Sequence, residues 1–318
     1  MNAQAILNRV NRRLPGYDAA ELLDEINDAY QECWDAITQL EDSYFTDIKT
    51  ITTATLASEF DFLRNGNAAL TSVLSNRYFQ IDRIRVLQPS DTNFIPANPR
   101  PWNDPQLLSI SQNTPQVAQT RAPYLYTLLG KGSVKFGNVF PVGTQFEVVY
   151  SFLFLPLTIL SNGTITNSGA VVTGIGTNFT QAVAPDFQGG LPIADDDVDI
   201  GLELLVAGAQ TYQVKSVASD TSLSTFQAIT PAASASNYQL AMVPDIPDGY
   251  HDTIATLATR NVMSTPGSDP RLAYWTARAK TALDSMRDGV MTRQRQEPPR
   301  RRRFPMSVLR YPGTAVNR

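Results

Sequence analysis

The sequence predicts an α+β protein, with a helical bundle built from N- and C-terminal helices, a β-sheet, and an inserted small all-β module of the barrel or sandwich type. Apolar residues recur at spacings of three and four near both ends of the 318-residue chain, as they do on the buried face of a helix. Alternating and β-branched residues fill the middle of the chain, which favours strands. A segment rich in glycine, threonine and asparagine interrupts those strands and contains almost no helix-forming run.

Two helices are expected at the N-terminus. Residues 3–12 form a short one, which Leu14-Pro15-Gly16 closes. Asp18 then suits the N-cap of a second helix, because Glu21 follows three residues later in a capping-box pattern. The second helix carries one apolar stripe, made of Leu22, Ile26, Ala29, Tyr30, Cys33, Ile37 and Leu40.

From about Phe45 the pattern changes to strands. Residues 45–56 are rich in threonine and isoleucine, and residues 78–89 alternate, with Phe79 and Ile81 followed, after a slip, by Ile84 and Val86. Residues 89–123 are dense in proline and asparagine and predict a long loop, which usually has a function. Within this loop Trp102 is the candidate tail-side contact. Residues 124–157 predict strands joined by glycine-containing turns.

Residues 158–241 predict the inserted all-β module, with short strands at intervals of about 8–12 residues. Ile165, Val171, Ile175 and Phe179 are expected to alternate inward in its first strands. Gly174-Ile175-Gly176 lacks the third glycine and the following helix of a dinucleotide-binding loop, so it predicts a turn or bulge. The expected domains are residues 1–157 plus 242–292, residues 158–241, and an arm at 293–318.

The helical pattern returns near the C-terminus. Pro247 suits a first helical turn, and the stripe that follows consists of Tyr250, Ile254, Leu257, Ala258 and Val262. Asp269-Pro270 then begins a last helix that is expected to end near Met286. Its apolar face consists of Leu272, Trp275, Ala279, Ala282, Leu283 and Met286.

The last 26 residues, 293–318, are basic and spaced by prolines. They contain eight arginines and one glutamate, a net charge of +7, which leaves −11 on residues 1–292 of a chain whose total is −4. Four prolines exclude a regular helix or central strand. Because large apolar residues are interleaved with the arginines, we expect an arm that docks on another protein. Its candidate contacts are Arg300, Arg301, Arg302, Arg303, Phe304, Arg310 and Tyr311.

The sequence shows no catalytic or metal-binding constellation, so no enzyme activity and no cofactor are expected. His251 is the single histidine and Cys33 the single cysteine, which excludes a zinc site built from these residue types. We expect His251 to be a surface or capping residue and Cys33 to be a small buried hydrophobe. Asp195, Asp196, Asp197 and Asp199 lack the pattern of an EF-hand and predict a solvated loop. No signal peptide or membrane span is expected.

The order of these elements resembles the head-to-tail adaptor, or connector, proteins of tailed bacteriophages. The similar segments are residues 8–37, 81–87 and 244–286, and they include the turn IPDGYHD before one helix and DPRLAYW at the start of the next. With the β-sheet that follows residues 81–87, the resemblance in the order of elements covers about two thirds of the chain. Residues 158–241 and 89–123 depart from the compact members of that family.

This resemblance implies a structural virion protein at the neck, made in the host cytoplasm and assembled into a ring, commonly of about twelve subunits. The ring would bind beneath the portal protein, contact tail, tail-tube or nozzle proteins, and let genomic DNA pass through without sequence-specific binding. Fibres are further candidate partners of residues 158–241. Two other functions remain open: a receptor- or carbohydrate-binding tail or fibre protein, and a nucleic-acid-binding protein that uses the arginine-rich arm.

Overall fold

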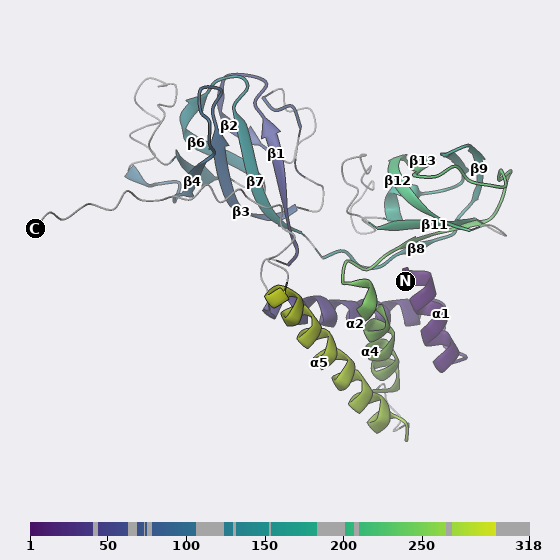
Figure 1. Cartoon of the computed structure of the whole chain (residues 1–318). Helices are drawn as coiled ribbons and strands as arrows, with labels where there is room; N and C mark the ends of the chain where they lie inside the picture. Colours follow the sequence, from purple (N-terminus) through teal and green to yellow (C-terminus); the bar gives the residue numbers. More distant parts are fainter. Residues whose placement is uncertain are drawn as a thin grey trace, which may run out of the picture.

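The protein has a mixed α and β fold, which was predicted, although strands outnumber helices. The structure, a computed structural model, describes residues 1–40, 44–62, 69–72, 74, 78–105, 124–129, 132–152, 154–182, 201–206, 210–264 and 269–296, with side chains up to Met291. Within these ranges lie four α-helices and two seven-stranded sheets (Figure 1).

The helices are α1 (Ala3–Arg13), α2 (Ala19–Leu40), α4 (His251–Ser264) and α5 (Leu272–Gln296), with short 3-10 turns η1 (Phe179–Ala182) and η2 (Asp248–Tyr250). Helix α4 packs against α1, α2 and α5, and α2 also contacts α1 and α5. Figure 1 places all four on one side of the two sheets. The N- and C-terminal segments of the chain therefore meet, as the apolar stripes at both ends require.

The N-terminal helices begin and end as the sequence predicts. The side chain of Asn2 accepts from the Ala5 N–H at 2.9 Å at the start of α1. The Asp18 carboxylate accepts from the Ala20 N–H at 3.1 Å just before α2. Gly16 between them has a φ of +100°, a conformation that glycine adopts without strain. Every residue of the predicted α2 stripe except Leu40 is buried.

Helix α5 is longer than predicted, because it continues past Met286 to Gln296. Met286 and Val290 are buried, so the apolar stripe extends through the additional turns. Gly289 interrupts the sequence pattern, but it lies where Tyr250 packs on the helix. A Cβ at position 289 would come within 1.6 Å of the Tyr250 hydroxyl oxygen. The first residues of the predicted arm, 293–296, are therefore helical and not extended.

The first sheet has the strand order β1-β7-β3-β4-β5-β6-β2. Its strands are β1 (Thr46–Thr52), β2 (Ala57–Asp61), β3 (Tyr78–Leu87), β4 (Ile95–Pro99), β5 (Tyr124–Leu128), β6 (Ser133–Phe140) and β7 (Gln145–Phe152). All neighbours are antiparallel except β4 and β5. The core of this sheet is strongly aromatic and contains Phe60, Phe62, Phe136, Phe140 and Phe146.

Two features of the first sheet correct the expected strand map. The predicted loop 89–123 contains β4, which the prolines at 96 and 99 concealed because proline cannot donate to a strand ladder. In β3 the expected slip is real: the register against β7 shifts between Ile81 and Arg83. Such a bulge moves later side chains to the other face, and Ile81 and Ile84 are both buried. Phe79 was expected on the same face as Ile81 but is 53 % exposed.

The second sheet consists of the strands between residues 159 and 242 and has the order β8-β14-β11-β12-β13-β10-β9. Its strands are β8 (Ile159–Leu160), β9 (Thr164–Ser168), β10 (Val171–Ile175), β11 (Leu202–Val206), β12 (Thr211–Ser219), β13 (Ser222–Thr225) and β14 (Tyr238–Met242). Ile165 of β9 exchanges two backbone hydrogen bonds with Ser236, at 2.9 Å each. Ser236 lies two residues before β14. The sheet therefore curls, so that β9, at one end of the strand order, approaches the segment that leads into β14, the second strand from the other end.

The expected inward face of β9 and β10 is half right. Ile165 and Phe179 are fully buried, whereas Val171 and Ile175 are exposed and Val172 takes the inward position. Adjacent valines leave the register of a strand ambiguous, because a shift by one residue exchanges its faces. Gly176 has a φ of +69°, which agrees with the predicted turn at Gly174–Gly176.

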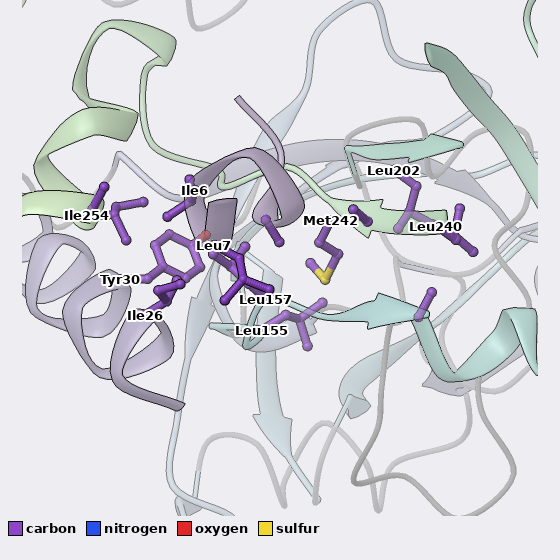
Figure 2. Close-up of a cluster of buried hydrophobic side chains, with 14 of the residues drawn as sticks. Ile6, Leu7, Ile26, Tyr30, Leu155, Leu157, Leu202, Leu240, Met242 and Ile254 are labelled. Carbon is purple, nitrogen blue, oxygen red and sulfur yellow. The ribbon is translucent and has the colours of Figure 1, made fainter. Parts of the chain in front are cut away.

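The helices share one buried cluster with the second sheet. Figure 2 shows Ile26 and Tyr30 of α2, Ile254 of α4 and the α1 residues beside Leu155 and Leu157, with Met242 and Leu240 of β14 continuing the cluster into the sheet. The aromatic core of the first sheet is a separate cluster. Phe152 packs against both clusters at their border. That residues 158–241 form a separately folding module stays a prediction.

Candidate protein-binding surfaces

Most of the predicted arm lies outside the described residues. The candidate contacts Arg300, Arg301, Arg302, Arg303, Phe304, Arg310 and Tyr311 are all among residues 297–318, which the structure does not describe. The helix that leads to the arm is described: Val290 of α5 is buried, Met291 is exposed, and the helix ends at Gln296. Trp102, the other candidate contact, follows β4 in a turn and is 64 % exposed.

His251 corrects the expectation of a surface or capping residue, because it is fully buried at the start of α4. The terminal ammonium of Met1 donates to His251 Nδ1 at 2.7 Å, and His251 Nε2 donates to the Ile246 carbonyl oxygen at 2.9 Å. Burial is the main cause that lowers the pKa of this imidazole. Both ring nitrogens are occupied by structural contacts, which leaves neither for general base chemistry.

Catalysis and metal binding have little support elsewhere in the described part of the chain. Cys33 is buried in α2, as predicted, and burial raises its pKa to about 12, so the reactive thiolate is not populated at neutral pH. No group of three histidine, cysteine, aspartate or glutamate residues among the described ranges could hold a metal ion. Asp195, Asp196, Asp197 and Asp199 lie outside those ranges.

Helix α2 presents a strongly acidic surface, which we call the acidic face and define as Asp24, Glu25, Asp28, Glu32 and Asp35. The sequence of α2 contains six acids and no lysine or arginine. Arg260 of α4 pairs with Glu32 at 2.6 Å, and Arg287 of α5 lies nearby. Burial, followed by the charges of Asp28 and Asp24, raises the pKa of Glu25. The carboxylates of this face are therefore close enough to repel one another.

The acidic face borders an open hollow of about 420 Å³ between α2 and α5. Ala36 and Leu283 contribute apolar surface to it. Its polar lining comes from Asp28, Gln31, Glu32, Asp35, Gln39 and Arg287. A hollow with an apolar part and an acidic rim can accept an aromatic or long aliphatic side chain that carries a donor or a positive charge.

A second surface of opposite sign, which we call the arginine patch, consists of Arg9, Arg12, Arg13 and Arg278 with Tyr274 and Trp275. It joins the end of α1 to the start of α5. The guanidinium carbons of Arg13 and Arg278 lie 5.0 and 5.2 Å from the centre of the Trp275 ring system, within cation–π range. Arg278 also donates to the Tyr274 hydroxyl at 3.1 Å.

Asp252 of α4 is the acid that anchors the arginine patch. It pairs with Arg9 at 2.9 Å and with Arg13 at 3.2 Å. Burial is the main cause that lowers the pKa of Arg13. The positive charges of Arg9 and Arg278 also lower this pKa, whereas the negative charge of Asp252 raises it. One carboxylate thus holds two of the arginines, and the patch keeps an excess of positive charge.

Sequence reasoning missed both the arginine patch and the acidic face. The acidic face had a readable signal, because residues 19–40 carry acids at spacings of three and four without a single base. The arginine patch had a weaker one, since Arg12 and Arg13 are adjacent but Trp275 and Arg278 belong to the other end of the chain. Only the packing of α5 beside α1 through α4 brings these residues together.

The helices of the described ranges include none that is both long and apolar enough to cross a bilayer. Comparison with known proteins identifies no relative: no protein-family model matches the chain, and a search of curated proteins returned no significant match.

Proposed function

We propose that this protein is a structural subunit of the head-to-tail adaptor ring of a tailed bacteriophage, bound beneath the portal and without enzymatic activity. The resemblance of residues 8–37, 81–87 and 244–286 to that family is the starting point. Those residues contribute α1, α2, β3, α4 and α5 of the described structure. The four helices pack against one another, so the similar segments at the two ends of the chain form a connected unit, while β3 belongs to the first sheet.

The turn IPDGYHD supports the proposal because each of its parts has a structural task. Residues 248–250 form η2 directly before α4. Tyr250 packs over Gly289 of α5, and His251 closes on the carbonyl oxygen of Ile246. This short segment therefore joins the two C-terminal helices, which explains its sequence without any catalytic role.

The observation that carries the proposal is the opposition between an acidic body and a basic arm on one chain. Residues 1–292 carry −11 and residues 293–318 carry +7. Val290 is buried and Met291 is exposed near the end of α5, and the arm begins two residues later at Arg293. An arm with arginines and aromatic residues suits docking on an acidic portal surface. An acidic body suits the wall of a channel, because it repels the phosphates of DNA that passes through.

The test is deletion of residues 297–318, which leaves α5 intact. The truncated protein should fold, as shown by an unchanged far-ultraviolet circular dichroism spectrum and thermal melt. It should fail to co-sediment with purified portal rings, while the full-length protein forms closed rings on the portal in negative-stain images. Normal attachment of the truncated protein would contradict the docking role of the arm.

The charge of the arm also favours a second candidate, a nucleic-acid-binding protein. Phosphate contacts release counterions, so binding of this kind falls steeply with salt. We expect portal attachment to persist at salt concentrations that release DNA from the arm. If instead the full-length protein aggregates with DNA and shows no affinity for the portal, the nucleic-acid function is favoured. Trimers without portal affinity would favour a tail or fibre protein.

A further inference from the structure

Two surfaces of opposite charge lie on the helical part of the molecule. The arginine patch has four arginines against Asp252, an excess of +3. The acidic face has five carboxylates against Arg260, an excess of −4, because Arg287 beside it pairs with Asp284 at 3.9 Å. Charge excesses of opposite sign on one subunit are a basis for self-recognition, because complementary potentials steer association and fix its register.

The arginine patch also has the side-chain types of a protein interface. Tyr274 is 58 % exposed and packs edge-on against Trp275, with ring centres 5.4 Å apart. Interfaces are enriched in tyrosine, tryptophan and arginine, and these residues anchor them when buried. Exposed Tyr274 is already oriented by the contact with Arg278, so docking it would cost less side-chain entropy than docking a mobile side chain.

The acidic face offers a matching receptor. Its hollow has Ala36 and Leu283 on the apolar part and Asp28 and Asp35 among the carboxylates. A tyrosine with an arginine beside it would place its ring on the apolar part of the hollow, and the guanidinium of the arginine would lie on the acidic rim. The same chain thus holds an aromatic–arginine surface and an acidic hollow that fit each other chemically.

The two surfaces are separated on the subunit. The ion pairs of Arg9 and Arg13 are made with Asp252 of α4 and not with α2. Along α5, Trp275 lies in the first turn, whereas Leu283 and Arg287 lie about 12 and 18 Å further along the axis. When a patch of one subunit docks on a different patch of the next subunit, the contact is head-to-tail, and it generates a closed ring where the rotation between neighbours closes.

We propose that the arginine patch of one copy of this chain docks on the acidic face of the next copy, and that this contact joins neighbouring subunits of the ring. The ring itself rests on the proposed function, whereas the contact does not. Two charge-complementary patches of this size would make assembly strongly salt-dependent, since exposed charges are screened beyond about 10 Å at 0.1 M salt.

The test is a charge exchange at exposed positions. Arg12→Glu with Arg278→Glu reverses the patch without removing Arg9 or Arg13 from Asp252. Asp28→Arg with Asp35→Arg reverses the charge that lines the hollow of the acidic face and leaves Glu32 paired with Arg260. All four positions are exposed, so the folded subunit should survive, which circular dichroism and thermal melts would check. Lys280→Glu, an exposed change two residues from Arg278 on the same helix, is the matched control.

Assembly of each purified full-length variant would be followed by sedimentation velocity and mass photometry at low and high salt. We expect the wild type and Lys280→Glu to form species larger than a dimer. Each reversed pair alone should raise the concentration needed for assembly by about tenfold or more. The protein that carries all four changes should assemble again, because its patch and face are complementary with the signs exchanged.

Several results would overturn the contact. These are assembly of either reversed pair at wild-type concentration, failure of the four-fold variant to regain assembly, and a wild type that stays monomeric at low salt. Loss of DNA binding by the patch variants with unchanged assembly would also overturn it. The proposed function fails separately: a protein that assembles by this contact but does not bind portal rings would support the contact and contradict the adaptor role.

Discussion

The hydroxyl oxygen of Tyr250 occupies the position beside α5 where any residue other than glycine at 289 would place its Cβ. The two atoms would be 1.6 Å apart. Glycine inside a helix normally weakens it by up to about 1 kcal/mol relative to alanine, so Gly289 has a packing reason to be there. It lets the turn before α4 lie directly against the last helix, which holds the two C-terminal helices in a fixed relation.

Gly289→Ala should therefore destabilise the protein although alanine favours helices. We expect a loss of about 1–3 kcal/mol in the free energy of unfolding, the usual cost of overpacking, measured by urea denaturation. Gly249→Ala is the matched control, because a Cβ there meets nothing within 4 Å. In a Tyr250→Ala background, Gly289→Ala should become neutral or stabilising. An equal loss in both backgrounds would contradict the steric explanation.

The buried His251 should make stability depend on pH in the mildly acidic range. Its pKa is lowered in the folded state, so the unfolded chain binds the proton more readily than the folded one. By linkage, stability is full above the ordinary histidine value of about 6.5 and is lost as the pH falls below it. The measurement is urea denaturation at several pH values from neutral downward.

A His251→Gln variant isolates this effect, because carboxylates titrate in both proteins. The variant will be less stable at neutral pH if it loses a buried hydrogen bond, but its stability should fall less between pH 7 and pH 5.5 than that of the wild type. Parallel curves for the two proteins would show that the buried imidazole does not titrate differentially.

The charges and the apolar residues of the arm should act on different steps of docking. Changing Arg300, Arg301, Arg302 and Arg303 to serine should slow association with the portal, mainly at low salt, because exposed charges steer encounter. Changing Phe304 and Tyr311 to alanine should shorten the lifetime of the complex at every salt concentration, by about 2 kcal/mol or more if they are buried anchors. Surface plasmon resonance separates the two rates. Equal salt sensitivity of both variants would mean that no buried anchor exists.

The two buried clusters should unfold as separate units. Phe136→Ala removes a large side chain from the core of the first sheet and should cost that unit about 3–5 kcal/mol. Met242→Ala should cost the other cluster about 2–5 kcal/mol. Hydrogen exchange read by mass spectrometry should show each loss confined to its own cluster. If Met242→Ala instead exposes β8–β14 while the helices stay protected, residues 158–241 fold independently, as the sequence predicted.

The sequence predicted the helices well because their stripes persist over several turns. It located α1, α2, α4 and the start of α5 from apolar spacing and from caps such as Asp18. It placed the end of α5 too early, near Met286, because the next buried apolar residue of the stripe, Val290, follows Gly289. It missed β4 for a related reason: local propensity argues against strand at Pro96 and Pro99, and only pairing with β3 and β5 overrides it.

Sites were harder to predict than elements. His251 was placed on the surface because nothing in a single histidine reveals burial, and its partners are Met1 and Ile246, of which the first is remote in sequence. The arginine patch depends in the same way on a contact between α1 and α5. Local patterns specify which side chains a helix exposes, while the meeting of distant exposed faces is decided by tertiary packing.

The pairing of β8 with β14 has a mechanical consequence. The chain enters the second sheet at Ile159 and leaves it at Met242, and the two strands are neighbours joined through Ala241 and Leu240. Tension along the chain between the first sheet and α4 would therefore load the β8–β14 pairing directly and reach the strands from β9 to β13 only through β14. The strands from β9 to β13 would lie beside the line of force, so they would stay folded under a load that strains the rest of the subunit.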